Sequence, residues 1–522
     1  MGKFGLLFSR YPKHSSVRPQ SFEGIQVKPA SAVSCGVLSF QSVPDKFYFL
    51  LFGAIRTKLG RHFSGSTDMV VVRAVSGSMG TGWLAELKRS APLAWLIGRQ
   101  WECAYGKLVD SIAYRSATWE HPIADIADWL KSKALWLTMK KQGERRSLQI
   151  GGIEVADLLV DSYLRFKPAP EFDAHDPFVR RLIWQALRDV RQANAYFSRV
   201  RPRWYLTSYS TYLEHGIPVR VALRHGVAVW SFGSLSHFAK KLCQADAFHT
   251  PDYSGYRRAF EALDGQAHRL EAARQQLEHR LSGGIDAATS YMRQSAYARP
   301  DVVLPDCLNG AVVIFLHDFY DSPHVYPDLV FGDFWQWACF TIDVFRRSGA
   351  NFFLKQHPNQ ITLNDEALVR LRGNFPGLKW LPAGASNVQL ARAGIACGVT
   401  VYGTVAHELA YLGVPSIGCA RHPHHAFDFC RTARTQDEYE NMLKNYSMLP
   451  VPIEEMQRQA LAFYYIHNLY GDEEQLVLRQ AFVDFWKVCN MGDCTEESVM
   501  RSFREMVDLP AFGRFVEGMA NG

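Results

Sequence analysis

The hydrophobic and polar positions alternate between short apolar runs and longer amphipathic stretches over most of the chain. Short apolar runs bounded by turn residues are typical of buried strands, whereas apolar residues spaced three and four apart are typical of helices. This pattern predicts strands at 69–75, 204–207, 227–231, 311–316, 351–355, 379–381, 395–401 and 415–419. It predicts helices at 123–131, 178–198, 334–347, 365–374, 386–393 and 405–412. Strands that alternate with helices indicate an α/β fold with parallel sheets.

The domain organisation is predicted from changes in composition. Residues 256–296 are rich in Arg, Glu, Gln and Ala, which indicates one or two exposed linker helices, and two prolines follow them. We therefore expect an N-terminal domain over 1–304, including these helices, and a C-terminal domain over 305–452. Residues 453–522 have no strand signal and are expected to form a helical tail that packs across both domains. Ligands of Rossmann-like sheets bind at the carboxyl ends of the strands, so a cleft between two such domains is the expected site.

Composition and charge exclude several classes of protein. A chain with 48% hydrophobic and 21% charged residues is neither disordered, collagen-like nor a coiled coil. The 58 basic and 51 acidic residues give a net charge of +7, which is mild for 522 residues and does not indicate a nucleic-acid partner. The ten cysteines are scattered without a C-x-x-C pair, which indicates a reducing, cytoplasmic compartment.

The most apolar short run lies at 47–55. It has about half of the ~20 residues that a membrane-spanning helix needs. A buried strand or helix face is the favoured interpretation, and binding at a membrane surface is the alternative. The first residues of the chain show no signal-peptide pattern. We therefore expect a soluble, cytoplasmic protein.

Several familiar site motifs are absent from the sequence, among them the P-loop, the nucleophile elbow and D-x-D. His407 and Glu408 begin like the zinc motif H-E-x-x-H, but Tyr411 stands where the second histidine belongs. His422 and His424 belong to a histidine-rich loop without helical metal-ligand spacing, so a loop on the rim of the cleft is favoured over a metal site. We expect no metal and no cofactor.

Polar side chains crowd the turn after the predicted strand 311–316. The turn contains His317, Asp318 and Asp321 beside aromatic residues. One interpretation is a capped turn with solvated side chains, which needs no ligand. The other is a site in which one of the two carboxylates acts as a general base or binds a ribose or an acceptor sugar.

A second group of donors follows the predicted strand 351–355. Lys355 is followed closely by His357, Pro358 and Asn359, and the proline restricts the backbone beside the imidazole. A histidine held there can donate a hydrogen bond to a phosphate oxygen and, when protonated, offset charge on a departing nucleotide. A purely structural histidine is the alternative.

A third stretch joins a predicted strand to the helix at 405–412. Thr404 stands at the expected N-cap, and the free N–H groups of a helix start commonly bind phosphate. Glu408, one turn into the helix, is within reach of a ribose hydroxyl. The other residues of this stretch that we place at the same site are Thr400, Tyr402 and Gly403.

A segment dense in hydroxyl groups follows the predicted strand 204–207. Hydroxyls and an acid at the end of a strand suit a sugar acceptor, which is recognised through many hydrogen bonds. An ordinary N-capped helix is the alternative. The candidate acceptor residues are Tyr209, Thr211, Tyr212, Glu214 and Arg220.

The order of these segments resembles a known family. A strand, a His-Pro loop, a strand, a Gly-Thr helix start and a Gly-x-Pro strand follow one another as in bacterial capsule polysaccharide biosynthesis glycosyltransferases, which include Kdo transferases. The strings HDFYDSPH, KQHPNQ and TVYGTVAHELAYLGVPSI resemble, over 311–440, an uncharacterised group of surface carbohydrate biosynthesis proteins. The resemblance is looser at 207–230 and 161–166.

This resemblance implies a GT-B fold, with a nucleotide-sugar donor in the C-terminal domain and a glycan or lipid-linked glycan acceptor in the N-terminal domain. It implies a metal-independent, inverting transfer in capsule or lipopolysaccharide assembly, with a CMP-Kdo-like donor as one candidate. The basic excess is compatible with peripheral contact at the cytoplasmic face of the inner membrane. The donor-binding residues would be His317, Lys355, Pro358, Asn359, Thr400, Tyr402, Gly403, Thr404 and Glu408.

The catalytic roles come partly from the resemblance, by which His357 would support the leaving phosphate. The sequence departs from the family at the base, because the acidic-glycine motif of CMP-sugar enzymes has no clear copy here. We assign the base to Asp318 or Asp321 from their position alone. Three other functions share the domain plan and stay open: a sugar-nucleotide epimerase, a polyol-phosphate transferase, and a non-catalytic polysaccharide-binding or export protein.

Overall fold

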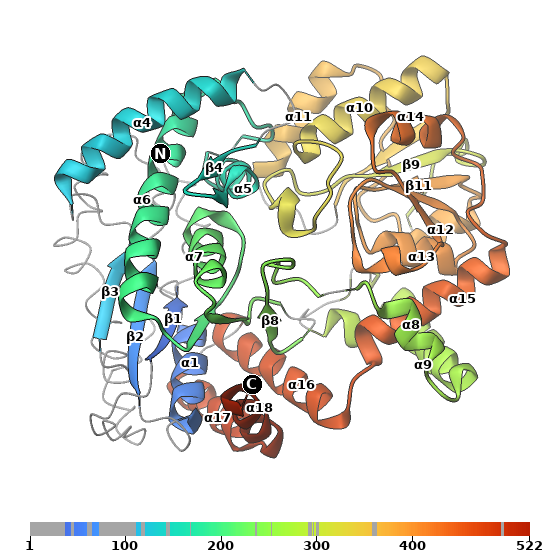
Figure 1. Ribbon diagram of the computed structural model, residues 1–522. Coiled ribbons are helices and arrows are strands. Elements are labelled where there is room, and N and C mark those ends of the chain that lie inside the picture. Colours follow the sequence, from blue (N-terminus) through green and yellow to red (C-terminus); the bar gives the residue numbers. More distant parts are fainter. Residues whose placement is uncertain are drawn as a thin grey trace. The chain divides into compact units, whose positions relative to one another are not determined.

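The structure is a computed structural model (Figure 1). It describes residues 37–42, 46–59, 65–72, 111–115, 121–141, 147–167, 169–234, 237–251, 253–290, 295, 297–298, 302–357, 363–491 and 495–521. The chain forms two compact units, Met1–Ser162 with Ala174–His249 and Asp472–Gly522, and Tyr163–Asp173 with Thr250–Gly471. Each unit is built around one main sheet, and nearly all neighbouring strands in these sheets are parallel. The predicted α/β class is therefore confirmed.

The sheet of the first unit has the strand order β3-β2-β1-β6-β7-β8. Its strands are β1 (Val37–Ser42), β2 (Ser66–Val72), β3 (Ser111–Arg115), β6 (Trp204–Thr207), β7 (Ala228–Ser231) and β8 (Lys240–Leu242). β8 is antiparallel to β7. All four residues of β6 are buried, as expected for an apolar run inside a parallel sheet. The short strands β4 (Gln149–Ile150) and β5 (Ile153–Glu154) form a separate antiparallel pair.

The described helices between β3 and β7 are α4 (Pro122–Lys140), α5 (Ala156–Phe166), α6 (Pro177–Val200) and α7 (Tyr212–Arg224). α6 has a strong start signal. The Asp176 carboxylate accepts the N–H of Phe178 at 2.8 Å, and Pro177 occupies the first turn, where its missing N–H loses no hydrogen bond. α4 packs along α6.

Helix α1 (Lys46–Leu59) forms a core with the C-terminal helices α16 (Glu473–Asn490), α17 (Glu496–Asp508) and α18 (Pro510–Asn521). The Phe47 ring lies 5.2 Å from that of Phe482 and 5.0 Å from that of Phe485. The described side chains of the apolar run 47–55 are buried in this core. The favoured interpretation of that run, a buried element rather than a membrane-binding one, is confirmed.

The sheet of the second unit is fully parallel, with the strand order β10-β9-β11-β12-β13. Its strands are β9 (Val312–Phe315), β10 (Phe352–Lys355), β11 (Cys397–Val399), β12 (Ser416–Gly418) and β13 (Cys430–Thr432). The helices of the alternating pattern are α10 (Phe334–Ser348), α11 (Leu363–Asn374), α12 (Asn387–Arg392), α13 (Val405–Tyr411) and α14 (Gln436–Lys444). The predicted strand 379–381 is reduced to one bridge between Leu354 and Trp380.

The compact units divide the chain at different points from those that we predicted. The predicted linker helices are α8 (Tyr256–Glu261) and α9 (Gln266–Leu281), and they belong to the second unit rather than to a domain over 1–304. The physical reason is that α9 buries Ala273 and Leu277 against Leu461 and Tyr464. The segment 453–522 is likewise divided, because α15 (Ile453–Tyr464) packs on α9 and α13, whereas α16 to α18 pack on α1.

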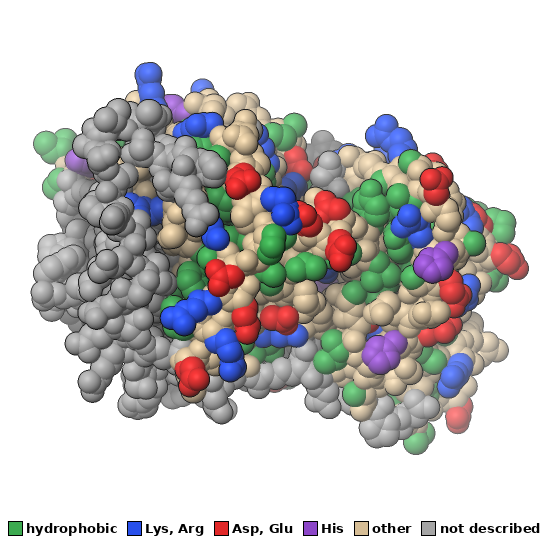
Figure 2. Space-filling view, turned by 90° about the horizontal axis from the view of Figure 1, so that it is seen from below, with side chains coloured by type: hydrophobic (Ala, Val, Ile, Leu, Met, Phe, Trp, Pro, Cys, Tyr) green, Lys and Arg blue, Asp and Glu red, His purple; other side chains and the backbone are tan. Residues whose placement is uncertain are grey.

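The described surface mixes charges of both signs. On the face seen in Figure 2, Lys and Arg side chains stand among Asp and Glu side chains rather than in one large basic patch. This agrees with the mild net charge of +7. In the part of the chain that the structure describes, no helix is both long and apolar enough to cross a membrane.

Candidate functional site

Three loops of the second unit meet at the carboxyl end of its sheet. β9 lies between β10 and β11, so the residues after these three strands are neighbours although they are far apart in the sequence. They line a cavity of about 340 Å³. The predicted donor residues that line it are His317, Lys355, His357, Thr400, Tyr402, Gly403, Thr404 and Glu408. Pro358 and Asn359 lie outside the described residues.

The loop between β11 and α13 is shaped by a local hydrogen bond. The Gly403 N–H donates to Thr400 Oγ1 at 3.0 Å. A Cβ at residue 403 would lie 2.7 Å from that oxygen, so only glycine fits without a shift. Thr404 stands at the predicted N-cap position but has helical dihedral angles, and its side chain makes no capping hydrogen bond. Its hydroxyl therefore stays available at the cavity.

Lys355 is the last residue of β10, and its cationic side chain lines the cavity. Its side chain is 8% exposed, and burial lowers its pKa, an effect that the nearby Glu408 partly opposes. Its ammonium has no hydrogen-bond or ion-pair partner among the described residues, and the Phe315 ring lies 5.7 Å from it. The cavity therefore contains the ammonium of a mostly buried lysine that forms no ion pair with the described residues.

His317 lies among aromatic rings at the same wall. Its imidazole stacks on Phe334, with ring centroids 5.0 Å apart, and lies 4.9 Å from the ring of Tyr402. Burial, together with the nearby His357, lowers the pKa of His317 to about 3. It is therefore neutral at physiological pH and can act as a hydrogen-bond donor or acceptor, but not as a cation.

Glu408 is almost fully buried and is tied to three partners. One carboxylate oxygen lies 2.7 Å from the guanidinium of Arg280, and the other accepts hydrogen bonds from Asn387, at 2.7 Å, and from the Tyr297 hydroxyl. These three partners also line the cavity. We did not predict them. Arg280 belongs to the segment assigned to a linker, Tyr297 directly follows that segment, and Asn387 follows an ordinary capping serine.

The histidine-rich loop contributes His422 to the cavity. The Nδ1 atom of His422 accepts the backbone N–H of His424 at 3.2 Å, so in the neutral ring the proton resides on Nε2. Burial and the neighbouring histidines lower the pKa of both His422 and His424 well below 6.5. The result is a neutral imidazole whose free N–H donor is fixed by the backbone.

The predicted bases Asp318 and Asp321 follow His317 closely in the sequence, but unlike His317 they do not line the cavity. Asp318 Oδ1 accepts the N–H of Tyr320 at 3.0 Å, and burial raises the pKa of Asp318. Asp321 is exposed and accepts the N–H of Ser322 at 2.9 Å. Both carboxylates therefore support the turn, and a role as base stays a prediction.

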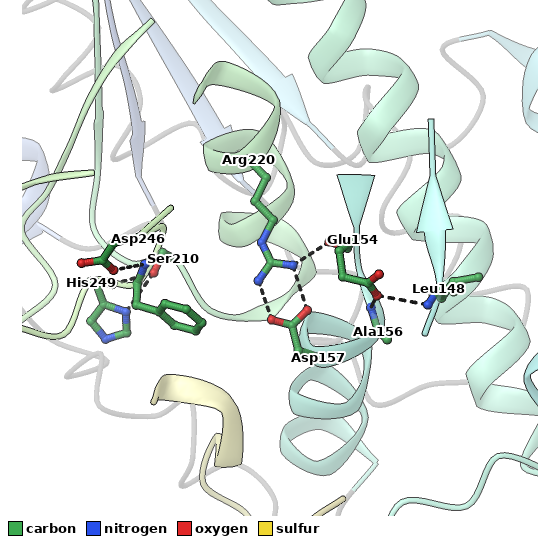
Figure 3. A network of polar contacts seen from close by, with 9 residues as sticks. Leu148, Glu154, Ala156, Asp157, Ser210, Arg220, Asp246 and His249 are labelled. Atoms are coloured by element: carbon green, nitrogen blue, oxygen red, sulfur yellow. Dashed lines mark hydrogen bonds and ion pairs between the residues drawn. The ribbon is translucent and has the colours of Figure 1, made fainter. Parts of the chain in front are cut away.

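Among the predicted acceptor residues, Arg220 is engaged in a structural contact (Figure 3). Its guanidinium forms a two-pronged ion pair with Asp157 and also donates to the Glu154 carbonyl at 2.6 Å. These bonds hold α7 against the start of α5, which leaves Arg220 little freedom to bind a ligand.

The remaining acceptor candidates lie at the start of α7. Thr211 is buried at the N-cap position without a side-chain capping bond, and Tyr212 has a φ of 61°, which is strained for a residue with a Cβ. Burial raises the pKa of Glu214 to about 8. Beside them, the Tyr209 ring packs on His249, whose backbone N–H donates to Ser210. The structure gathers these residues, and an acceptor role for them stays a prediction.

Within the described ranges, no three or more His, Cys, Asp or Glu side chains are grouped as ligands of a metal ion. No protein-family model matches the chain, and no curated protein matches it significantly.

Solved structures match this chain over most of their length at low similarity. The UDP-GlcNAc 2-epimerase of Methanocaldococcus jannaschii, solved with UDP-GlcNAc and UDP, is 8% identical with a TM-score of 0.26, covering 81% of this chain and 97% of that chain. HepE of Anabaena, solved with UDP and glucose, is 11% identical with a TM-score of 0.26, covering 85% and 97%. The glycosyltransferase SsfS6 of Streptomyces sp. SF2575 is 10% identical with a TM-score of 0.21, covering 82% and 95%. Values this low do not indicate a shared activity, and the α/β class rests on the two sheets described above.

Proposed function

We propose that the second unit binds the phosphate-bearing part of a nucleotide sugar in its cavity and that the protein is a glycosyltransferase of bacterial surface polysaccharide assembly. One observation carries the binding step, the buried ammonium of Lys355 without a partner among the described residues. A buried charge is costly unless an opposite charge or hydrogen bonds replace its lost hydration. A phosphate bound in the cavity would supply both.

The surroundings of Lys355 support a phosphate as the anion. The Thr404 hydroxyl and the fixed N–H of His422 are neutral donors at the same cavity. Phosphate accepts several hydrogen bonds at once, so a cation surrounded by neutral donors suits it. The volume of about 340 Å³ lies in the usual range of small-molecule sites, roughly 300–1,000 Å³.

Glu408 and Asn387 support recognition of the sugar part of a nucleotide. An ionised carboxylate has about four lone-pair sites, and the three partners of Glu408 occupy three of them. The remaining acceptor site can bind a ribose hydroxyl. Because Arg280 already neutralises Glu408, that hydroxyl would meet a carboxylate of fixed position and balanced charge.

Transfer of the sugar is supported by the sequence resemblance to capsule polysaccharide glycosyltransferases. In that reaction an acceptor hydroxyl attacks the anomeric carbon, the bond from this carbon to the phosphate oxygen breaks, and the nucleotide departs with added negative charge. Lys355 and His357 line the cavity where this charge would develop. The acceptor proton would pass to a carboxylate, for which Asp318 is the first candidate. A CMP-Kdo-like donor and a glycan or lipid-linked acceptor complete the proposal.

Binding is tested by thermal unfolding of the full chain with CMP, CDP, UDP or GDP. A ligand at a hundredfold excess over its Kd stabilises the folded state by about 2.7 kcal/mol. We expect one nucleotide to raise the Tm of the wild type and not that of Lys355→Met. Lys379→Met, which removes an exposed lysine of the same unit, is the matched control. The binding proposal is wrong if no nucleotide stabilises the wild type or if Lys355→Met responds fully.

Transfer is tested separately, by nucleotide release from the matching sugar nucleotide with and without a glycan acceptor, in buffer containing EDTA. Acceptor-dependent release in EDTA supports a metal-independent transferase. Isomerisation of the sugar nucleotide without acceptor would instead show an epimerase. Binding without any turnover would show a carbohydrate-binding protein.

A further inference from the structure

Helix α4 carries a stripe of large apolar side chains on its outer surface. Most surface helices of globular proteins turn their apolar stripe toward the core. In α4, the residues on the buried face are Asp125, Ser132 and Met139. The opposite stripe, which spans about 60° of a helix with 3.6 residues per turn, is exposed. Its members are Ile123 (87% exposed), Ile126 (52%), Leu130 (68%) and Leu137 (47%).

This orientation is held by polar contacts with α6, on which α4 packs (Figure 1). Asp125 forms ion pairs with Arg188, at 3.3 Å, and with Arg191, at 2.6 Å. Asp128 pairs with Arg191 at 2.9 Å. A helix rotated to bury its apolar stripe would leave the fully buried Arg188 without its carboxylate, which is strongly destabilising. The exposed stripe is therefore specified by the fold.

The outward charges of α4 are positive. Lys131, Lys133 and Lys141 are exposed, and Lys140 lies over the Trp136 ring at 3.6 Å. The two acidic residues of the helix are turned inward and paired with arginines. The outer side of α4 therefore combines an apolar stripe with flanking lysines, the arrangement of helices that lie in the interface of an anionic membrane.

We propose that α4 binds the surface of a bilayer that contains anionic lipids, with Ile126 and Leu130 inserted at the boundary between headgroups and acyl chains. Charge complementarity favours this occupant over a second copy of the chain. A symmetric contact between two copies would bring the same lysines against one another, which is unfavourable. The nineteen residues of α4 include five ionisable side chains, so the helix would lie along the interface rather than span the membrane.

The test is cosedimentation of the full chain with vesicles of phosphatidylcholine alone or with one third phosphatidylglycerol. We expect binding to the anionic vesicles only, and at least a ~10-fold loss of binding in Ile126→Gln/Leu130→Gln, because two apolar side chains no longer leave water. Lys131→Gln/Lys133→Gln should weaken binding and reduce its dependence on salt. The matched control is Val369→Gln, which removes an apolar side chain that is 70% exposed in the second unit.

Equal melting temperatures of all variants would show that the substitutions leave the fold intact. The proposal is overturned if the wild type ignores anionic vesicles or if Ile126→Gln/Leu130→Gln binds them as well as Val369→Gln does. It is also overturned if sedimentation equilibrium shows that the Ile126→Gln/Leu130→Gln variant dissociates a wild-type dimer while vesicle binding is unchanged, because α4 would then be an interface between copies. None of these measurements depends on nucleotide binding.

Discussion

Arg280 and Glu408 form an ion pair of 2.7 Å at the wall of the cavity and connect α9 to α13. Arg280 keeps 13% of its side chain exposed and Glu408 keeps 3%, so both charges have lost most of their water. Such a pair contributes little compared with apolar residues of the same size, but removing one partner leaves an uncompensated buried charge.

We predict that Arg280→Met destabilises the protein by about 3–5 kcal/mol in urea unfolding, because Glu408 is left buried without its cation. Adding Glu408→Gln should recover part of this loss, since the amide carries no charge and can still bond Asn387. Arg274→Met, on the same helix, removes an exposed pair with Glu271 and should change stability by less than about 1 kcal/mol. Equal stabilities of Arg280→Met and Arg274→Met would contradict the prediction.

Two substitutions of His422 should distinguish the roles of its two ring nitrogens. Asparagine can place its carbonyl oxygen near the position of Nδ1 and accept the His424 N–H, but it offers no donor at Nε2. Glutamine can place an amide donor near Nε2 but loses the acceptor. We therefore expect His422→Asn to keep the wild-type melting temperature and lose nucleotide stabilisation, and His422→Gln to do the opposite. The reverse result would show that His422 serves only the loop.

Glu214 should impose a pH dependence on stability. Its pKa is raised to about 8 by burial and, less strongly, by Asp189, against 4.5 for the free side chain. Between these values the folded state holds a proton that the unfolded state has released, so the wild type loses stability as pH rises from 4.5 to 8. Glu214→Gln, which cannot ionise, should lack this slope and exceed the wild type most above pH 8. Chemical denaturation at several pH values measures the free energy of unfolding of both proteins. If the two proteins show the same dependence on pH, Glu214 is ionised in the folded protein.

The two candidate bases differ in how far their carboxylates are buried. Asp318 is half-buried with a raised pKa, whereas Asp321 is exposed. We expect Asp318→Asn to lower turnover by at least ~10²-fold while nucleotide stabilisation persists, because the amide keeps the bond to the Tyr320 N–H but not the basicity. Asp321→Asn should keep near-normal turnover. If both variants turn over normally, the base lies elsewhere, and Glu214 is the next candidate.

The cavity of the second unit could be predicted because several of its lining residues follow parallel strands directly. A run such as Val312–Phe315 is recognisable as a buried strand, and parallel strands present their carboxyl ends at one edge. His317, Lys355 and Thr404 therefore came together as expected. The hydrogen bonds of these side chains were not predictable. Thr404, for example, occupies the N-cap position without making the capping hydrogen bond, because its dihedral angles are already helical.

The partners of Glu408 were missed because the pairing depends on the tertiary fold. Arg280 lies in a polar stretch whose two buried residues, Ala273 and Leu277, are too few to distinguish a packed helix from an exposed linker. The orientation of α4 was missed for a related reason. Its apolar period is clear, and periodicity normally assigns the apolar face to the core, but the ion pairs of Asp125 with α6 reverse that choice.

The core around α1 has a consequence for how the chain acquires its structure during synthesis. α1 (Lys46–Leu59) lies far in the sequence from α16 to α18, which cover Phe47, Leu51 and Phe52, so these partners are synthesised long after it. The first unit therefore cannot complete its core until α16 to α18 have been synthesised, although most of its sheet has emerged long before. In the interval the apolar side chains of α1 are not yet covered by these helices. A nascent chain of this protein is therefore expected to bind chaperones that hold exposed apolar segments.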